Sequence, residues 1–204
     1  MQIQGLFPTA LAASQLNCNT QQLIDYAHTL EAASPGAARA GGWQSGALDF
    51  NAPELAALLN EVANSVQGLA HHLWNFKPEF TLALDNGWIN NNRSEAALNN
   101  NWSHLHGGHF VSLVYYAQVP EQSGNLILEP AHQFLDYCVP EQILDELTPW
   151  NAQRHHHTPQ TGQLIAFPSW IRHSAQPNTT GKERISYAFN ASIAKAQQAR
   201  SAQR

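Results

Sequence analysis

The chain has 204 residues, of which 43% are hydrophobic and only 12% are charged, and its formal net charge at pH 7 is −5. This length suits a single domain with a substantial buried core. The acidic balance argues against a protein that binds nucleic acid through its phosphates, because such a protein needs basic groups. No stretch approaches the ~20 apolar residues of a membrane span, so we expect neither nucleic acid nor membrane as a partner.

Two further observations concern the compartment. The N-terminus lacks the basic start and the apolar run of a signal peptide. The two cysteines, Cys18 and Cys138, are too few for a disulfide framework. We therefore expect reduced thiols and a cytoplasmic protein.

The first 78 residues predict one short strand and two supporting helices. Residues 3–7 have the composition of a strand. Asn19 or Thr20 can cap a helix whose apolar residues keep helical spacing to Leu30. Between Ala33 and Gly46, a proline and several glycines predict a loop.

The second predicted helix starts near Asn51, which we expect to be its N-cap. Pro53 stands early in this helix, where proline is tolerated. The apolar residues that follow keep helical spacing to about Phe76, and Pro78 ends the pattern.

From residue 79 the pattern changes to short apolar strands. Asp85, Asn86 and Gly87 predict a turn between two of them, and residues 140–147 predict a short helix. Two helices followed by many strands indicate a mainly β sandwich or barrel backed by helices, with a mouth that can hold a ligand. We expect the β core to span 79–194 and a polar tail to span 195–204. The strands are predicted at 80–84, 88–90, 110–119, 125–128, 163–167 and 183–193.

Three histidines form the most informative group in the chain. His104 and His106 are separated by one residue at the entrance to an apolar strand, and residues i and i+2 of a strand point to the same face. His173 opens a later strand, after Phe167-Pro168-Ser169-Trp170. Two ligands early and one late is the order in which a double-stranded β-helix (a jelly-roll, cupin-like fold) assembles a mononuclear metal site. Imidazole suits zinc, copper, iron and nickel, so we predict that the three histidines share a metal.

The other histidines carry weaker signals. His155, His156 and His157 cannot all face one ion, because successive strand residues point to opposite faces, so a solvated strand end is the preferred interpretation. His109 is close enough to the predicted site for contact with substrate, but its role stays open. His28 and His132 have no evident partners.

Arg184 predicts an anion next to the metal. In the alternating pattern of its strand, Arg184 shares a face with Ser186, Ala188 and Asn190. A buried arginine needs a partner, and its planar fork matches a carboxylate, to which Ser186 can donate a further hydrogen bond. The alternative is a salt bridge to one of the chain's own acids.

The order and spacing of these motifs resemble the 2-oxoglutarate- and iron(II)-dependent dioxygenases, and more closely a family of them found in bacteria and phages. The resemblance covers almost the whole chain. Its pieces are Gly42-Trp43-Gln44-Ser45, Trp88-Ile89-Asn90, His104-Leu105-His106, Ser112 to Pro120, Ser123-Gly124-Asn125-Leu126, Gly162 to Trp170, His173, Arg184-Ile185-Ser186 and Phe189-Asn190.

The resemblance implies a set of site residues and two cofactors. Fe(II) would be held by His104, His106 and His173. The co-substrate 2-oxoglutarate would be bound by Arg184, Ser186 and Asn90.

One position departs from the wider superfamily. His106 stands where most members carry Asp or Glu, although the closer family resembles this chain in having histidine there. Three nitrogen ligands leave the site one negative charge poorer than the usual facial triad, so zinc or nickel could also occupy it. Whether Glu129 acts as a fourth ligand stays open.

The function implied by the resemblance is hydroxylation of an unidentified small molecule or side chain, coupled to decarboxylation of 2-oxoglutarate to succinate. Two alternatives remain at this point. One is a cupin-like three-histidine dioxygenase that uses no 2-oxoglutarate, against which the placement of Arg184 and Ser186 argues. The other is a non-catalytic metal- or ligand-binding barrel, which His106 supports. A homodimer also stays open.

Overall fold

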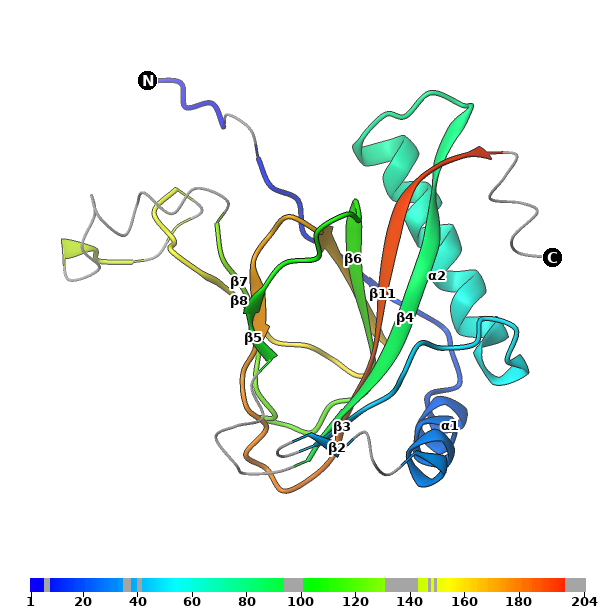
Figure 1. Ribbon diagram of the computed structural model, residues 1–204. Helices are drawn as coiled ribbons and strands as arrows, with labels where there is room; N and C mark the ends of the chain where they lie inside the picture. The colour runs from blue at the N-terminus through cyan, green and yellow to red at the C-terminus, as the bar shows by residue number, and fades with distance from the viewer. Residues whose placement is uncertain are drawn as a thin grey trace.

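The protein consists of two antiparallel β-sheets with helices against the outer face of the larger one (Figure 1). The computed structural model describes residues 1–5, 8–34, 38–39, 42–93, 101–130, 143–146, 148 and 150–196. This mainly β architecture with flanking helices confirms the predicted double-stranded β-helix core.

The larger sheet has seven strands in the spatial order β1-β9-β6-β11-β4-β3-β2. Its centre is the long pair β4 and β11, and β6 lies on the other side of β11. The strands are β1 (Ala12–Gln15), β2 (Ala38–Arg39), β3 (Gly42–Gln44), β4 (Phe80–Asn92), β6 (Val111–Gln118), β9 (Gln163–Pro168) and β11 (Arg184–Lys195).

The smaller sheet has four strands in the order β5-β10-β7-β8. It faces the side of the larger sheet that the helices do not cover (Figure 1). Its strands are β5 (Asn101–His104), β7 (Leu126–Leu128), β8 (His155–His157) and β10 (His173–Ala175).

The helices bury the outer face of the larger sheet. They are α1 (Thr20–Ala33), a 3-10 turn η2 (Pro53–Leu55), α2 (Ala56–Gly68) and a π-helical turn η3 (Leu69–Leu73). On α2, Leu58, Val62 and Val66 recur at helical spacing and are fully buried. Burying each such side chain stabilises the folded state by roughly 1.5–3 kcal/mol relative to leaving it exposed to water.

Strand β11 divides its side chains between the two faces as its alternation predicts. Ile185, Tyr187 and Phe189 are fully buried in the core shared with the helices. Arg184 and Ser186 lie on the opposite face and line a cavity between the sheets. One strand therefore builds both the hydrophobic core and the wall of the cavity.

The N-terminal strand was predicted in the wrong place. Residues 1–5 form no strand, and residues 6–7 lie outside the described part of the chain. The strand is β1, where Ala12 pairs with Ala166 of β9 and Gln15 with Gln163. An edge strand of small and polar residues has no hydrophobic alternation, so its position depends on the neighbouring strand.

The loop predicted between Ala33 and Gly46 contains the short strands β2 and β3. Trp43 of β3 pairs with Asn91 of β4. Gly42 is required there, because a Cβ atom would lie 2.4 Å from the Asn91 carbonyl oxygen. The glycine that suggested a loop instead permits a close strand contact.

The start of the second helix also differs from the prediction. Asn51 is not the N-cap: its backbone N–H donates to the Asp49 carboxylate at 2.9 Å, and the helical region begins as the 3-10 turn after Ala52. At the other end, the helical spacing continues through η3 but stops at Leu73, before Phe76. The first helix is capped as predicted, since Asn19 Oδ1 accepts from the backbone N–H of Gln22.

The turn predicted at Asp85-Asn86-Gly87 is wrong. These residues lie within the continuous strand β4, and the register shifts where Asn190 pairs with Asn86 and Ala191 with Leu84. The shift leaves Asp85 as the extra residue of a β-bulge, a feature with the same polar, glycine-containing signature as a turn. The remaining predicted strands are present.

Some predictions concern residues that the structure does not describe. Half of the helix predicted at 140–147 lies outside the described residues, and the described half, 143–146, forms no α-helix. His132, Cys138 and the tail beyond residue 196 also lie outside the described residues.

Replacing Gly87 tests the tight packing of the central strand pair. A Cβ atom at Gly87 would lie 2.7 Å from Phe189 Cδ1 and 3.0 Å from the Ala188 carbonyl oxygen. We expect Gly87→Ala to lower the free energy of unfolding by about 1–3 kcal/mol, measured by urea denaturation. Gly68→Ala is the control: nothing lies within 4 Å of its Cβ position on α2, so the helix should gain about 0.5–1 kcal/mol. Equal effects of the two changes would contradict the packing argument.

Candidate metal centre and ligand cavity

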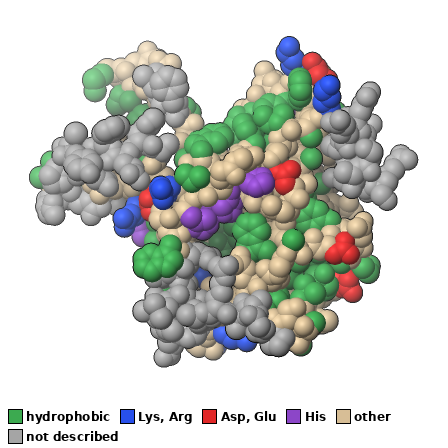
Figure 2. Space-filling view, viewed as in Figure 1, with side chains coloured by type: hydrophobic (Ala, Val, Ile, Leu, Met, Phe, Trp, Pro, Cys, Tyr) green, Lys and Arg blue, Asp and Glu red, His purple; other side chains and the backbone are tan. Residues whose placement is uncertain are grey.

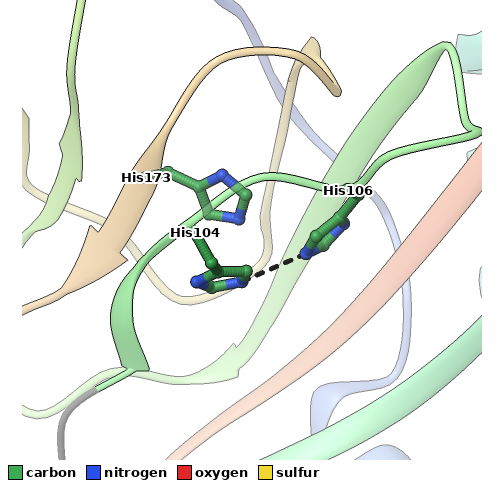
Figure 3. A group of neighbouring side chains, drawn as sticks. All are labelled: His104, His106 and His173. Atoms are coloured by element: carbon green, nitrogen blue, oxygen red, sulfur yellow. Dashed lines mark hydrogen bonds between the residues drawn. The ribbon is translucent and has the colours of Figure 1, made fainter.

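Three histidine side chains converge at the edge of the smaller sheet, as Figure 3 shows. His104 is the last residue of β5, and His173 is the first residue of β10 and pairs with it directly. Their ligand nitrogens and that of His106 all lie within 4.8 Å of one another. Histidines also gather on the surface in the space-filling view (Figure 2). The structure thus brings together the predicted trio.

The argument that placed His106 was only partly correct. We predicted that His104 and His106 share a strand face, but β5 ends at His104. His106 lies in the following segment, where its backbone N–H donates to the Ser169 carbonyl at 3.0 Å. The convergence therefore depends on a contact with the β9–β10 connection rather than on strand pleating.

Hydrogen bonds define which nitrogen each imidazole offers. His104 Nδ1 lies 2.6 Å from the Trp102 carbonyl oxygen, and His173 Nδ1 lies 3.0 Å from the Ile171 carbonyl oxygen. A carbonyl only accepts, so both Nδ1 atoms carry the proton. Each neutral ring then turns the lone pair of Nε2 toward the centre of the trio.

His106 follows the same rule through a side chain. Its Nδ1 lies 2.6 Å from Asn190 Oδ1 and 3.0 Å from Ser112 Oγ. Its Nε2 lies 3.1 Å from His104 Nε2, the contact drawn in Figure 3. Two lone pairs at this separation repel each other unless a cation lies between them. A metal ion that is about 2.1 Å from each nitrogen would fit this separation. The donor set fits a divalent metal.

Burial favours the neutral form of two of these imidazoles, His106 and His173. Desolvation lowers the pKa of His173 to about 4, opposed by its hydrogen bond to Ile171 and assisted by the neighbouring His104 and His106. Desolvation also lowers the pKa of His106, against the effect of its hydrogen bond to Asn190. Neutral imidazole is the form that binds metal, so at neutral pH the site is prepared for an ion.

The trio forms one wall of a cavity of about 420 Å³ between the two sheets. This size suits a small organic ligand beside a metal. Aromatic and aliphatic side chains make up part of the wall. Besides the histidines, the polar residues that line it are Gln44, Asn90, Asn92, Ser112, Tyr116, Ser174, Arg184 and Ser186.

Arg184 is the unusual charge in this cavity. Its side chain lies on the cavity wall, and the residue is only 3% exposed. Nη1 donates to the carbonyl oxygens of Ser123 at 2.5 Å and Gly124 at 3.3 Å, and Nη2 donates to that of Gln176 at 3.0 Å. Among the described residues no carboxylate forms an ion pair with it. The salt-bridge alternative thus receives no support from the described part of the chain.

The surroundings of Arg184 hold the guanidinium without neutralising it. Burial lowers its pKa, and the nearby Tyr116 phenol acts in the opposite direction. Burial raises the pKa of Tyr116 itself to about 12, so at neutral pH the phenol carries no charge. A buried cation held only by neutral oxygens is complementary to an anionic ligand.

The other predicted co-substrate residues lie beside Arg184. Ser186 of β11 pairs with Asn90 of β4, and both are buried on the cavity wall. Two further residues lie next to them: Tyr116, opposite Ser186 on β6, and Gln44, opposite Asn90 on β3. Sequence reasoning missed Gln44 as a site residue because β3 had been assigned to a loop.

The remaining histidines and Glu129 stand apart from the trio. His155 to His157 form β8, whose first two residues are exposed, in keeping with a solvated strand end. His28 does have a partner, since its Nε2 lies 2.7 Å from Glu183 Oε2. Within the described residues the metal-ligating group contains the three histidines alone, without Glu129.

His109 packs against the bulge of β4 instead of lining the cavity. Its Nδ1 lies 2.8 Å from Asp85 Oδ2, which also accepts a hydrogen bond from Ser192 Oγ. These contacts link His109 to β4 and β11.

The fold and this site define a double-stranded β-helix protein suited to bind a metal and an anion in one cavity, and sequence comparison names the family. The family model described as "Putative 2OG-Fe(II) oxygenase" matches residues 86–190, which include all three histidines, Arg184 and Ser186. The chain belongs to this family. It is accordingly an oxidoreductase, and the family implies Fe(II) and 2-oxoglutarate as its cofactors.

Solved structures share the fold at low sequence identity. A Pseudomonas putida prolyl-4-hydroxylase has a TM-score of 0.56 at 14% identity, covering 90% of this chain and 92% of that one. A Trichoplax adhaerens prolyl hydroxylase, in complex with a hypoxia inducible factor peptide fragment, gives 0.59 at 12%, covering 95% and 87%. The α-ketoglutarate-dependent epimerase SnoN from nogalamycin biosynthesis gives 0.63 at 13%, covering 92% and 81%.

Two further findings are negative. No curated protein matches the chain significantly. Within the described residues, no helix has both the length and the apolar character that a bilayer span requires.

The buried neutral state of His173 predicts an acid-sensitive apoprotein. Its pKa is about 4 in the folded protein against 6.5 for an unperturbed histidine, so between these values the unfolded chain binds the extra proton. The contribution of neutral His173 to the free energy of unfolding is therefore fully present above pH 6.5. It is lost as the pH falls toward 4, and the loss amounts to up to about 3 kcal/mol. Chemical denaturation of metal-free protein across this range measures the loss. The control His156→Ala, on the exposed strand β8, should leave the slope unchanged, and a wild-type slope in His173→Gln would contradict the assignment.

Proposed function

We propose that the chain hydroxylates a small molecule or an amino-acid side chain, with His104, His106 and His173 holding Fe(II) and Arg184 holding a carboxylate of 2-oxoglutarate. One observation carries this proposal. A buried guanidinium without a carboxylate partner among the described residues lines the same cavity as three converging Nε2 atoms.

The cavity suits a dicarboxylate at its polar end. Arg184 keeps N–H groups that its three carbonyl partners do not use, because a guanidinium has five. Ser186 and Asn90 add a hydroxyl and an amide beside it, and the Tyr116 phenol, neutral at working pH, adds another donor. Together they offer one full positive charge and several hydrogen bonds to a carboxylate.

The positions of these groups indicate what the metal and the protein's residues would each contribute. Bound iron would activate oxygen and drive the decarboxylation of 2-oxoglutarate. The protein's residues supply the rest: three neutral imidazoles hold the ion, Arg184 orients the co-substrate, and the walls of the two sheets keep water from the reacting atoms.

The substrate would enter beside the metal. Trp88 and Trp102 both line the cavity, and the Trp88 ring lies 5.6 Å from that of His106. Trp102 is 74% exposed, which is unusual for so large an apolar side chain next to a buried site. Of the solved structures that share this fold, one is in complex with a peptide fragment and another is an enzyme from nogalamycin biosynthesis, which supports either an amino-acid side chain or a small molecule as substrate.

Several coarser expectations belong to the same proposal. We propose one domain over 1–204, with supporting elements at 1–78, the β core at 79–194 and a polar tail at 195–204. The protein would act in the cytoplasm without nucleic acid as a partner. Homodimerisation is open to measurement by light scattering.

A non-catalytic binding barrel is the second candidate, because His106 replaces the usual acid and a neutral ligand set could hold an inert metal. Turnover separates the two functions. Anaerobically purified protein supplied with Fe(II), 2-oxoglutarate and oxygen should form succinate even without its true substrate, as an uncoupled reaction. A metal-loaded protein that forms none would favour the binding barrel.

Removing Arg184 tests the co-substrate site. We expect Arg184→Ala to weaken 2-oxoglutarate binding by about 2–5 kcal/mol, the cost of truncating one partner of a buried charge pair, measured by calorimetry with anaerobic Fe(II) protein. Arg184→Lys should restore only part of the affinity, since an ammonium lacks the bidentate fork. Arg154→Ala, at an exposed position, is the control. Unchanged affinity in Arg184→Ala would exclude this role.

Substituting the histidines tests the metal site. His104→Ala and His173→Ala should each abolish stoichiometric iron, measured by metal analysis after desalting, whereas His156→Ala should retain it. His106→Asp should also weaken iron binding, because an acceptor, Asn190 Oδ1, faces this position at 2.6 Å and would oppose a carboxylate. Full iron in His104→Ala or His173→Ala would refute the corresponding ligand assignment. Tighter iron and faster turnover in His106→Asp would instead mark His106 as a tolerated variant of the usual triad.

A further inference from the structure

We propose that Asn190 is the positioning residue that makes His106 a metal ligand, by fixing its tautomer and ring orientation through an amide oxygen. The inference rests on the proposed metal site and adds a role for a residue that binds neither metal nor co-substrate.

The contact is short, buried and specific. Asn190 is 4% exposed, and its Oδ1 lies 2.6 Å from His106 Nδ1. His104 and His173 use backbone carbonyls for the same purpose. His106 lies beyond the end of β5, and its Nδ1 contacts two side chains instead: Asn190 Oδ1 at 2.6 Å, the shorter contact, and Ser112 Oγ at 3.0 Å.

The Asn190 amide also contacts a second asparagine. Asn190 Nδ2 donates to Asn86 Oδ1 at 2.9 Å, and Asn190 Oδ1 faces the imidazole. If the amide were reversed, Nδ2 would donate to His106 Nδ1 and the ring proton would move to Nε2. The nitrogen that faces the other histidines would then have no lone pair for a metal.

The ladder of the large sheet supports this arrangement. Asn190 pairs with Asn86 of β4 on one side and with Ser112 of β6 on the other. Three neighbouring strands therefore present one polar row behind His106. Ser112 Oγ lies 3.3 Å from Asn190 Oδ1 and 3.0 Å from Ser169 Oγ, and the Ser169 carbonyl accepts the backbone N–H of His106. The same network thus holds both the ring and the backbone of the histidine.

The chemistry explains why an amide suits this position. Partners in the outer shell of a metal-bound histidine fix the ring and its tautomer, and their loss typically costs 10–100-fold in metal affinity. An amide oxygen accepts the Nδ1 proton without adding charge. A residue at 190 must therefore accept a hydrogen bond, whereas its own donor group serves only Asn86.

This requirement separates three substitutions. Asn190→Leu keeps a similar size and removes the acceptor, so Co(II) affinity should fall 10–100-fold. Asn190→Asp keeps an acceptor toward His106, and Asn86 can turn its amide to donate, so Co(II) affinity should stay within the same order of magnitude as in wild type. Ser192→Ala is the control: Ser192 lies one pleat further along β11 and bonds to Asp85, so Co(II) affinity should not change.

Two measurements read the outcome independently of turnover. Co(II) titration followed by visible absorption gives affinity and coordination, and ¹⁵N NMR of the metal-free protein reports the tautomer of each histidine. Wild type, Asn190→Asp and Ser192→Ala should show His106 protonated at Nδ1, and Asn190→Leu should show a mixture with Nε2. Circular dichroism melts establish that each variant is folded; if Asn190→Leu is not, the comparison rests on Asn190→Asp and on the wild-type tautomer.

Each contrary result has a distinct meaning. Wild-type affinity and tautomer in folded Asn190→Leu would overturn the inference, as would loss of Co(II) in Asn190→Asp or an Nε2-protonated His106 in wild type. Failure of wild-type protein to bind Co(II) would instead overturn the proposed metal site on which the inference rests.

Discussion

The antiparallel ladder of β11 between β4 and β6 is the constraint on which the rest of the molecule depends. Its alternation places Ile185, Tyr187 and Phe189 in the core beneath the helices and turns Arg184, Ser186 and Asn190 the other way. Because β11 is hydrogen-bonded on both edges, its register cannot slip without exchanging these two faces. Stability and chemistry are therefore carried by the same strand.

The two ends of the cavity favour ligands of opposite charge. At one end, the ligand nitrogens of three imidazoles converge, an arrangement that favours a cation. At the other end, Arg184 is a buried cation supported only by carbonyl dipoles, an arrangement that favours an anion. A divalent metal and a dicarboxylate satisfy both, which is the combination that membership in the oxygenase family implies.

Much of the site could be predicted because its residues belong to regular strands or to distinctive motifs. The alternation of β11 correctly placed Arg184 and Ser186, and the spacing of the histidines correctly grouped them. Errors arose where one local signal has two structural meanings. Asp85-Asn86-Gly87 has the composition of a turn but forms a bulge, and Gly42 has that of a loop but allows β3 to approach β4. Only pairing with a distant strand distinguishes these cases.

The sequence by itself determined the chemistry available: which residues can ligate a metal, which cation can meet a carboxylate, and which faces of the strands are apolar. These properties follow from residue type and local periodicity. The tertiary structure decided what those groups do together. His106 reaches the other histidines through contacts with Ser169 and Asn190, and the absence of an acidic partner for Arg184 among the described residues depends on which segments fold around it. Both are relations between residues far apart in the chain, and only packing can establish them.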